Sequence, residues 1–309
     1  MLVVRFRGGL GNQMYQYAFC LKLRRLFPGV IVKTDLQEYN AIKHHYGYEV
    51  NHIFPVIEPI ENIRGMEYKR LIGEIPMLNA GPFTKLEEAI RIKLNKLFCS
   101  VNQEIILKEE NFDLDRLKEC YGDVFLQKDF YLDGFWASIN QYIKELDYLR
   151  RNFVFREFTN DKNVDLSKEI KEIESVSVHI RRGDYLQSDF DILSLEYYKY
   201  AIEYICNKTD NPVFYFFSDD PEFIKNNFSF VENKRVIDWN KKQNSFRDMQ
   251  LMSMCKHNII ANSTFSQWGA LLNSNPEAII IYPSMKDKVN RMEKVQLKNW
   301  HQVELEDIL

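Results

Sequence analysis

The sequence lacks the features that mark membrane-spanning, secreted and nucleic-acid-binding proteins. No stretch approaches the ~18 apolar residues of a membrane-spanning helix, and the apolar run before Arg5 is too short for the core of a signal peptide. The 41 Lys and Arg residues are balanced by 44 Asp and Glu residues, whereas a protein that coats nucleic acid carries a large basic excess. These absences favour a globular protein with no transmembrane segment and no nucleic-acid partner.

The five cysteines form no recognisable metal or redox motif. Their number is odd, there is no Cys-x-x-Cys pair, and the nearest two, Cys99 and Cys120, are far apart in the chain. The pattern therefore favours reduced, mostly buried thiols over a zinc finger or a thioredoxin-like motif. Reduced thiols are typical of the cytoplasm.

Aromatic residues, in contrast, are abundant. The 309 residues include 22 Phe, 17 Tyr and 4 Trp, and most of these side chains are expected in the core. The length predicts about two domains, and the 45% hydrophobic and 28% charged residues are ordinary for a globular protein.

Strand-like and helix-like segments alternate along most of the chain. Strands are expected at 2–6, 30–32, 128–135, 176–180, 213–217, 234–237, 258–261 and 278–282, and helices at 12–26, 85–98, 138–151, 195–206, 221–227, 245–255 and 265–272. This alternation predicts βαβ units and parallel sheets, hence an α/β fold. The highly charged residues 156–174 are interpreted as a linker, which divides the chain into domains 1–157 and 158–309.

Ligands of such sheets bind beyond the carboxyl ends of the strands, and four polar motifs follow predicted strands. The first is Arg7-Gly-Gly-Leu-Gly-Asn-Gln13, a strand-to-helix turn whose amides can face an anion. It has Met14 where a dinucleotide-binding fingerprint has its third glycine, and it lacks the Gly-Lys-Ser/Thr of a P-loop. A tight turn without a ligand is the alternative.

The other three motifs lie in the second half. His179-Ile-Arg-Arg-Gly-Asp-Tyr185 offers arginines for a phosphate, with a surface ion pair as the alternative. Phe217-Ser-Asp-Asp220 offers carboxylates for a hydroxyl-rich ligand or a helix cap. Asn262-Ser-Thr-Phe-Ser-Gln-Trp268 places hydroxyls and an amide at a helix N-terminus, where an anion can bind.

Two Asp-x-Asp triplets, Asp113–Asp115 and Asp189–Asp191, could bind a metal in some transferases, but the pattern is weak in an acidic chain. The histidine spacing fits no zinc site. No metal and no cofactor are therefore expected.

In this order the motifs resemble those of glycosyltransferase family 11, the α-1,2-fucosyltransferases. The similar blocks are GGLGNQMYQYAF at 8–19, YLDGFW at 131–136, HIRRGDY at 179–185, FSDD at 217–220 and NSTFSQWGALLN at 262–273. The resemblance implies a GT-B-like fold of two Rossmann-like domains facing across a cleft. It implies a C-terminal domain that binds GDP-β-L-fucose and an N-terminal domain that binds mainly the acceptor.

The resemblance also implies roles for individual residues. Arg181 and Arg182 match an arginine pair on the donor phosphates, Asp184 matches the acid that orients them, and His179 opens the same motif. The remaining donor-site residues implied are Gly9, Gly11, Asn12, Asp248 (for guanine), Asn262, Ser263, Thr264 and Ser266. Asp189 is a candidate general base, although the cationic transition state does not demand a strong one.

The predicted reaction is inverting, metal-independent transfer of L-fucose to the 2-hydroxyl of a galactose-terminated oligosaccharide or lipid-linked glycan. A bacterial enzyme of surface polysaccharide synthesis is expected, in the cytoplasm or peripherally at the inner face of the membrane. A fucosyltransferase of another linkage and a non-catalytic carbohydrate-binding protein remain open, and Met14 disfavours a nicotinamide dehydrogenase. Tyr185, Phe265 and Trp268 are the aromatic residues placed to stack on a nucleotide or sugar.

Overall fold

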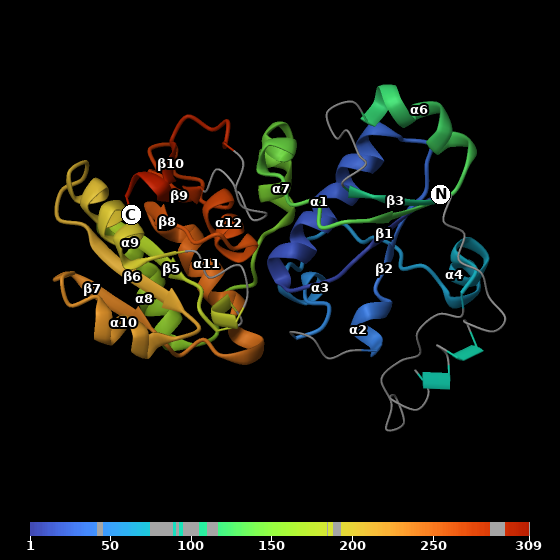
Figure 1. Cartoon of the computed structure of the whole chain (residues 1–309). Helices are drawn as coiled ribbons and strands as arrows, with labels where there is room; N and C mark the ends of the chain where they lie inside the picture. The colour runs from blue at the N-terminus through green and yellow to red at the C-terminus, as the bar shows by residue number, and fades with distance from the viewer. Residues whose placement is uncertain are drawn as a thin grey trace. The chain divides into compact units, whose positions relative to one another are not determined.

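The computed structural model describes residues 1–41, 46–74, 89–90, 93–94, 105–109, 117–183, 185–187, 193–284 and 294–308. The chain forms two compact units, Met1–Val154 and Phe155–Leu309. The division lies three residues before the one expected after residue 157. Figure 1 shows the elements of both units in chain order.

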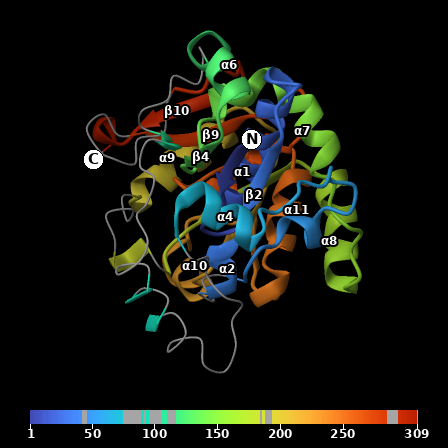
Figure 2. The same cartoon turned by 90° about the vertical axis from the view of Figure 1, so that its right-hand side faces the viewer.

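The N-terminal unit is built on a four-stranded parallel sheet. Its strands are β1 (Leu2–Arg5), β2 (Val32–Asp35), β3 (Ile106–Lys108) and β4 (Phe130–Asp133), in the order β2-β1-β4-β3. Its described helices are α1 (Leu10–Leu26), α2 (Gln37–Ala41), α3 (Val50–Ile53), α4 (Gly65–Ile72), α6 (Leu117–Gln127) and α7 (Leu146–Asn152). Helix α2 follows β2 directly and lies beyond its carboxyl end in both views (Figures 1 and 2).

The C-terminal unit contains a six-stranded parallel sheet. Its strands are β5 (Ser175–Ile180), β6 (Val213–Ser218), β7 (Lys234–Ile237), β8 (His257–Ile259), β9 (Ile280–Ser284) and β10 (Trp300–Glu304), in the order β10-β9-β8-β5-β6-β7. Its helices are α8 (Asp161–Glu172), α9 (Leu195–Cys206), α10 (Pro221–Asn227), α11 (Phe246–Met254) and α12 (Thr264–Leu271). The strand order reverses between β5 and β8, as in doubly wound nucleotide-binding sheets.

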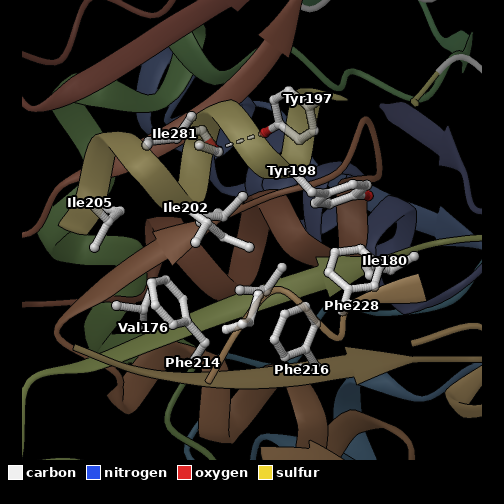
Figure 3. Close-up of a cluster of buried hydrophobic side chains, with 14 of the residues drawn as sticks. Val176, Ile180, Tyr197, Tyr198, Ile202, Ile205, Phe214, Phe216, Phe228 and Ile281 are labelled. Carbon is white, nitrogen blue, oxygen red and sulfur yellow. Dashed lines mark hydrogen bonds between the residues drawn. The ribbon is translucent and has the colours of Figure 1, made fainter. Parts of the chain in front are cut away.

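Two apolar layers cover the faces of the C-terminal sheet. One face packs against α9 and α10, and Figure 3 shows Ile202 of this layer near Val176 and Phe214 of the strands. The Tyr197 hydroxyl in the same layer donates hydrogen bonds to the backbone carbonyls of Ile260 and Ile281, at 2.6 and 3.3 Å. The other face packs against α8, α11 and α12. The sheet is thus buried on both sides.

Most predicted elements of the second half are present. The expected ranges of α9, α10 and β7 coincide with the observed ones, and the other expected strands and helices there are displaced by one or two residues at their ends. β10 was not predicted. In the first half, β2 begins two residues later than expected, and the predicted helix at 138–151 begins as a 3-10 helix over Ile139–Glu145 without a side-chain cap from Ser138. Most of the helix expected at 85–98 lies outside the described residues.

The interpretation of residues 156–174 as a linker is wrong. Residues Asp161–Glu172 form α8, which Asn160 caps through its side chain by accepting a hydrogen bond from the amide of Lys162. Leu166 and Ile170 are one helical turn apart and lie buried against the sheet. The many charges therefore belong to the solvated face of an amphipathic helix.

Burial of the cysteines is only partly as expected. Among the described residues Cys20 and Cys255 are buried, whereas Cys120 and Cys206 are exposed, and all four are free thiols. None of the helices in the described part of the chain combines the length and apolarity that a bilayer crossing requires.

Candidate active site

The candidate site lies where the C-terminal sheet reverses its strand order. The motif that begins at His179 leaves the end of β5, and the Asn262 turn follows β8, the neighbouring strand. On the other side of β5, Ile180 is paired in register with Ser218 of β6, so Asp219 and Asp220 follow at the same edge. Three of the four predicted motifs thus meet at the position where open α/β sheets bind their ligands.

Two arginines at this edge are held by two aspartates. Arg181 Nη1 lies 2.9 Å from Asp219 Oδ2, and Arg182 Nε lies 3.2 Å from Asp220 Oδ2. The backbone amide of Arg182 also donates to Asp219 Oδ1 at 3.0 Å. The four side chains are 25–37% exposed. Because each guanidinium has five N–H donors, the pairs fix the arginines and leave donors for an anion.

Neighbouring groups fix the same loop. Asp220 accepts a hydrogen bond from the amide of Phe223 and so caps α10, and the Phe223 ring lies 3.6 Å from the Arg182 guanidinium carbon. A Cβ at Gly183 would lie 2.9 Å from Asp219 Oδ2, so a side chain there would displace the carboxylate that holds Arg181. The sequence left open whether Asp220 binds a ligand or caps a helix. In the structure Asp220 caps α10 and also holds Arg182.

The N-terminus of α12 contributes positive potential on the other side of β5. The helix begins after Ser263, and its first turn carries no acidic residue. The first amides of a helix have no intrahelical partner, so they can face an anion. The Tyr185 hydroxyl donates to the carbonyl of Asn262 at 3.4 Å, which links the arginine loop to this turn.

The hydroxyl-bearing residues of the turn differ in their surroundings. Ser263 is buried, and Thr264 begins α12. Ser266 is fully buried, and its hydroxyl donates to the carbonyls of Ala261 and Ser263 at 3.2 and 3.1 Å. These bonds explain Ser266 as a brace of the turn, and its placement near a diphosphate stays a prediction.

His179 lies beneath the arginine loop as a neutral ring. Burial, and after it the charge of Arg181, lowers the pKa of His179 to about 3. Its ring lies 5.5 Å from the ring of Phe265, and its Nδ1 is buried without a hydrogen-bond partner. A neutral imidazole here adds no charge that would compete with the arginines.

Asp248 lies in the first turn of α11 and belongs to a separate polar network. Its carboxylate accepts a hydrogen bond from the Asn240 side chain at 2.8 Å, and Asn240 in turn contacts Asn163. Burial raises the pKa of Asp248 to about 8. Its predicted contact with guanine is not tested by these bonds.

The predicted aromatic stacking residues separate into three environments. Trp268 is fully buried in the core, so its prediction as a stacking residue is wrong. Phe265 packs against the apolar layer of α8 and α11. Tyr185 is partly exposed, and its ring centre lies 5.7 Å from the Arg181 guanidinium carbon, so it is the one of the three next to the arginines.

The glycine-rich loop belongs to the N-terminal unit. Gly8 adopts φ +79°, Gly9 is the N-cap of α1, and Gly11 and Asn12 lie in its first turn. The buried Gln16 holds the loop, since it accepts a hydrogen bond from the amide of Arg7 and donates to its carbonyl. The predicted contacts of Gly9, Gly11 and Asn12 with the donor stay predictions.

Several predicted residues lie outside the described part of the chain. These are Asp184, Asp189 and both Asp-x-Asp triplets. Within the described residues, no three His, Cys, Asp or Glu side chains gather as metal ligands. Among the described residues, Asp219 and Asp220 hold the arginines. The resemblance implied such a role for Asp184, and that role stays a prediction. The register of β5 and β6 was the missing information, because it places the two motifs side by side.

Comparison with known proteins agrees with this geometry. The family model described as glycosyl transferase family 11 matches residues 1–304. An alpha-1,2-colitosyltransferase of Escherichia coli is 30% identical over 92% of this chain and 91% of its own. A galactoside alpha-(1,2)-fucosyltransferase 1 of Leontocebus fuscicollis is 24% identical over 58% of this chain and 53% of its own.

Among solved structures, the fucosyltransferase NodZ from Bradyrhizobium aligns with a TM-score of 0.52 at 15% identity, over 95% of this chain and 96% of that one. This likeness concerns the fold. The two parallel α/β units form a GT-B fold, as predicted.

Proposed function

This chain belongs to glycosyl transferase family 11, and from that membership we propose that it transfers L-fucose from GDP-β-L-fucose to the 2-hydroxyl of a terminal galactose, with inversion of the anomeric carbon. The observation that carries the proposal is the arginine pair held by Asp219 and Asp220 at the point of strand reversal. The names of the colitosyltransferase and the fucosyltransferase relatives both support a 1,2 linkage. The name of the fucosyltransferase also supports a galactoside acceptor.

The proposed chemistry assigns the arginines to the leaving group. As the bond from fucose to the diphosphate breaks, negative charge grows on the phosphate oxygens and positive charge grows on the sugar. Donors fixed in advance stabilise such charge without reorganisation. Arg181, Arg182 and the amides at the start of α12 would stabilise the departing GDP.

The acceptor 2-hydroxyl attacks the opposite face of the anomeric carbon, forms the new C–O bond and loses its proton. Asp189 stays the candidate base. The developing cation makes the acceptor hydroxyl acidic late in the step, so a weak base suffices. In this proposal the GDP diphosphate departs with the electron pair of the broken bond.

We propose further that transfer needs no metal ion, because the arginines and α12 provide positive charge at the diphosphate. Excess EDTA should leave the rate within about twofold of the untreated enzyme. A control with added Mg²⁺ or Mn²⁺ should also show no gain. Loss of activity with EDTA and its recovery with Mn²⁺ would return the Asp-x-Asp triplets to consideration.

The test of the proposed function is a transfer assay with GDP-fucose and a galactose-terminated disaccharide, followed by linkage analysis of the product by NMR. The expected product carries α-linked fucose at the 2-position. A 1,3 or 1,6 linkage contradicts the specificity and keeps the reaction class. Sugar binding without GDP affinity in calorimetry contradicts the enzyme and favours a carbohydrate-binding protein.

A second donor is favoured by the 30% identity to the colitosyltransferase. Colitose is the 3-deoxy form of L-fucose, so the two donors differ by one hydroxyl. The same assay with GDP-colitose distinguishes them through kcat/KM. A colitose preference would revise the donor and leave the arginine pair in its proposed role.

A further inference from the structure

A polar cavity in the N-terminal unit is not used by the donor chemistry. It has a volume of about 250 Å³, and its lining includes Arg5, Asp35, Glu38, Tyr68, Tyr131 and Asp133. Arg5, Asp35 and Asp133 end the three strands β1, β2 and β4, and the register pairs Arg5 with Asp35. The cavity therefore lies at the carboxyl ends of the N-terminal sheet.

Its position within that sheet is that of a ligand site. The strand order β2-β1-β4-β3 places β1 between the strand that follows it in sequence and the later strand β4. Arg5 and Asp133 stand on the two sides of this reversal, where open parallel sheets bind ligands. The middle sequence block 131–136 supplies Tyr131 and Asp133, and the donor chemistry leaves this block without a role.

Among the charged residues that line the cavity, Arg5 is basic and Asp35, Glu38, Glu74 and Asp133 are acidic. Arg5 donates to Asp133 Oδ2 at 3.2 Å and to Glu38 Oε2 at 3.1 Å, and Arg7, which is outside the lining, lies with its Nη1 3.6 Å from Asp133 Oδ1. The excess of acids over bases disfavours an anion. The paired donors and acceptors suit the hydroxyl groups of a neutral polar ligand.

Hydrogen bonds fix the side chain of Asp35 in the cavity. Its carboxyl group is buried, accepts a hydrogen bond from the Tyr131 hydroxyl at 2.6 Å and accepts another from the amide of Gln37 at 3.0 Å. Burial raises the pKa of Asp35. In the part of the chain that the structure describes, no three acidic side chains gather here as they would around a metal ion.

Another part of the lining is apolar and aromatic. The rings of Tyr68 and Tyr131 lie 6.2 Å apart in an edge-to-face arrangement, beside Ile72 and Ile106 in the same cluster. A pyranose ring has both kinds of surface, since its hydroxyls suit carboxylates and guanidinium groups and its C–H face suits an aromatic wall. The volume is below the roughly 300–1,000 Å³ of pockets for larger small molecules, so it suits a single sugar ring better than a nucleotide.

We propose that this cavity binds one neutral pyranose ring of the glycan acceptor, with Glu38 and Arg5 hydrogen-bonded to its hydroxyls. The inference rests on the proposed function, because that function makes a glycan the second substrate. Arg5 uses two of its five donors in its ion pairs, and its side chain is 33% exposed, against 22% for Glu38. Both side chains can therefore reach a ligand without leaving their pair.

The test compares Glu38→Ala with Glu61→Ala as a matched control. Glu61→Ala removes the same charge as Glu38→Ala and breaks the ion pair between Glu61 and Lys33. Glu61 lies outside the cavity lining. Glu38→Ala should raise the KM for a galactose-terminated disaccharide about tenfold or more, the loss typical of a hydrogen bond to a charged group. Glu38→Gln keeps an acceptor oxygen and should lose less. The dissociation constant for GDP and the melting temperature should stay unchanged in all three.

An acceptor KM of Glu38→Ala within twofold of the parent enzyme overturns the inference. If the parent enzyme transfers no sugar, the proposed function fails and the cavity is tested alone by NMR titration with methyl β-D-galactoside. Binding that Glu38→Ala abolishes and Glu61→Ala retains supports the cavity as a sugar site. Absence of binding, or binding of Mn²⁺ alone in the same titration, overturns it.

Discussion

The two units place similar residues at equivalent positions and surround them differently. In each, arginine stands at the end of the first strand of the sheet or directly after it, and carboxylates from adjacent elements hold the guanidinium group. In the C-terminal unit the pairs are Arg181 with Asp219 and Arg182 with Asp220. In the N-terminal unit Arg5 is shared by Glu38 and Asp133.

The surroundings decide which ligand each set suits. The C-terminal set lies beside the start of α12, where the helix dipole adds positive potential and the first turn of the helix carries no acidic residue. The N-terminal set lies beside the further acids Asp35 and Glu74 and two tyrosines. An arginine at a strand end therefore does not by itself indicate a phosphate site. The net charge and the apolar side chains around the arginine determine which ligand the site suits.

The largest effect is expected for Arg182→Ala, which tests whether the C-terminal set of residues stabilises the leaving group. We expect kcat to fall about 10²–10³-fold, as for the loss of one fixed donor to a developing charge, about 2.7–4 kcal/mol. The KM for the acceptor should change little, because the N-terminal cavity is untouched. Steady-state kinetics with both substrates varied measures the two effects separately.

The matched control is Arg235→Ala. Arg235 is 56% exposed and paired with Glu169 at 2.7 Å, far from the strand ends that carry the candidate site. Its removal should leave kcat unchanged and cost less than about 1 kcal/mol of stability. Transfer by Arg182→Ala within twofold of the parent would remove this arginine from the mechanism.

Asp219→Asn tests whether the aspartate orients the arginine or merely neutralises it. Asparagine can still accept the hydrogen bond from the Arg182 amide, but it loses the ion pair with Arg181. We expect kcat to fall about tenfold, of the order of one charge-assisted hydrogen bond. GDP should bind as tightly as before or more tightly, because a negative charge has left the anion site.

This split between kcat and GDP affinity identifies a positioning role. Asp165→Asn, an exposed surface change on α8, serves as the control. Parallel weakening of GDP binding and kcat would contradict positioning and indicate that the loop itself is disrupted.

Much of the C-terminal fold could be predicted because its strands are apolar and its helices follow residue types that favour the N-cap position, such as Ser194, Asp220 and Ser263. The helix Pro221–Asn227 begins with proline after a capping aspartate, and its predicted ends are the observed ones. α8 was missed because its apolar stripe is narrow and its remaining residues are charged. β10 was not predicted because the sequence of Trp300–Glu304 neither alternates between apolar and polar residues nor forms a continuous apolar run. The strand is only partly buried.

The motifs at the site were predictable and their contacts were not. Strand ends could be located from sequence, so the arginines, the aspartates and the Asn262 turn were found. Which acid holds which arginine depends on the register of β5 with β6, and register is a property of the assembled sheet. Likewise Trp268 belongs to a functional-looking block but lies in the core.

A pH-dependent effect on stability is expected from the buried acid Asp248. Because its pKa in the folded protein is about 8, against ~3.9 in an unfolded chain, the folded state keeps a proton that the unfolded state releases. The stability from this group is therefore complete below pH ~4 and is lost as the pH rises toward 8. Asp248→Asn stays neutral, so its melting temperature should exceed that of the parent at pH 9, and by less at pH 6.

The affinity for GDP, measured over the same pH range, tests whether Asp248 contacts the guanine base of the nucleotide that the arginines are proposed to bind. An ionised Asp248 accepts hydrogen bonds from guanine N–H groups better than a protonated one. GDP affinity of the parent should therefore rise between pH 6 and 9, while that of Asp248→Asn stays flat. A contact between Asp248 and guanine would make GDP affinity depend on the protonation of Asp248. If GDP affinity changes with pH equally in both proteins, guanine is recognised by other residues. Asp248 then serves only the hydrogen-bond network with Asn240.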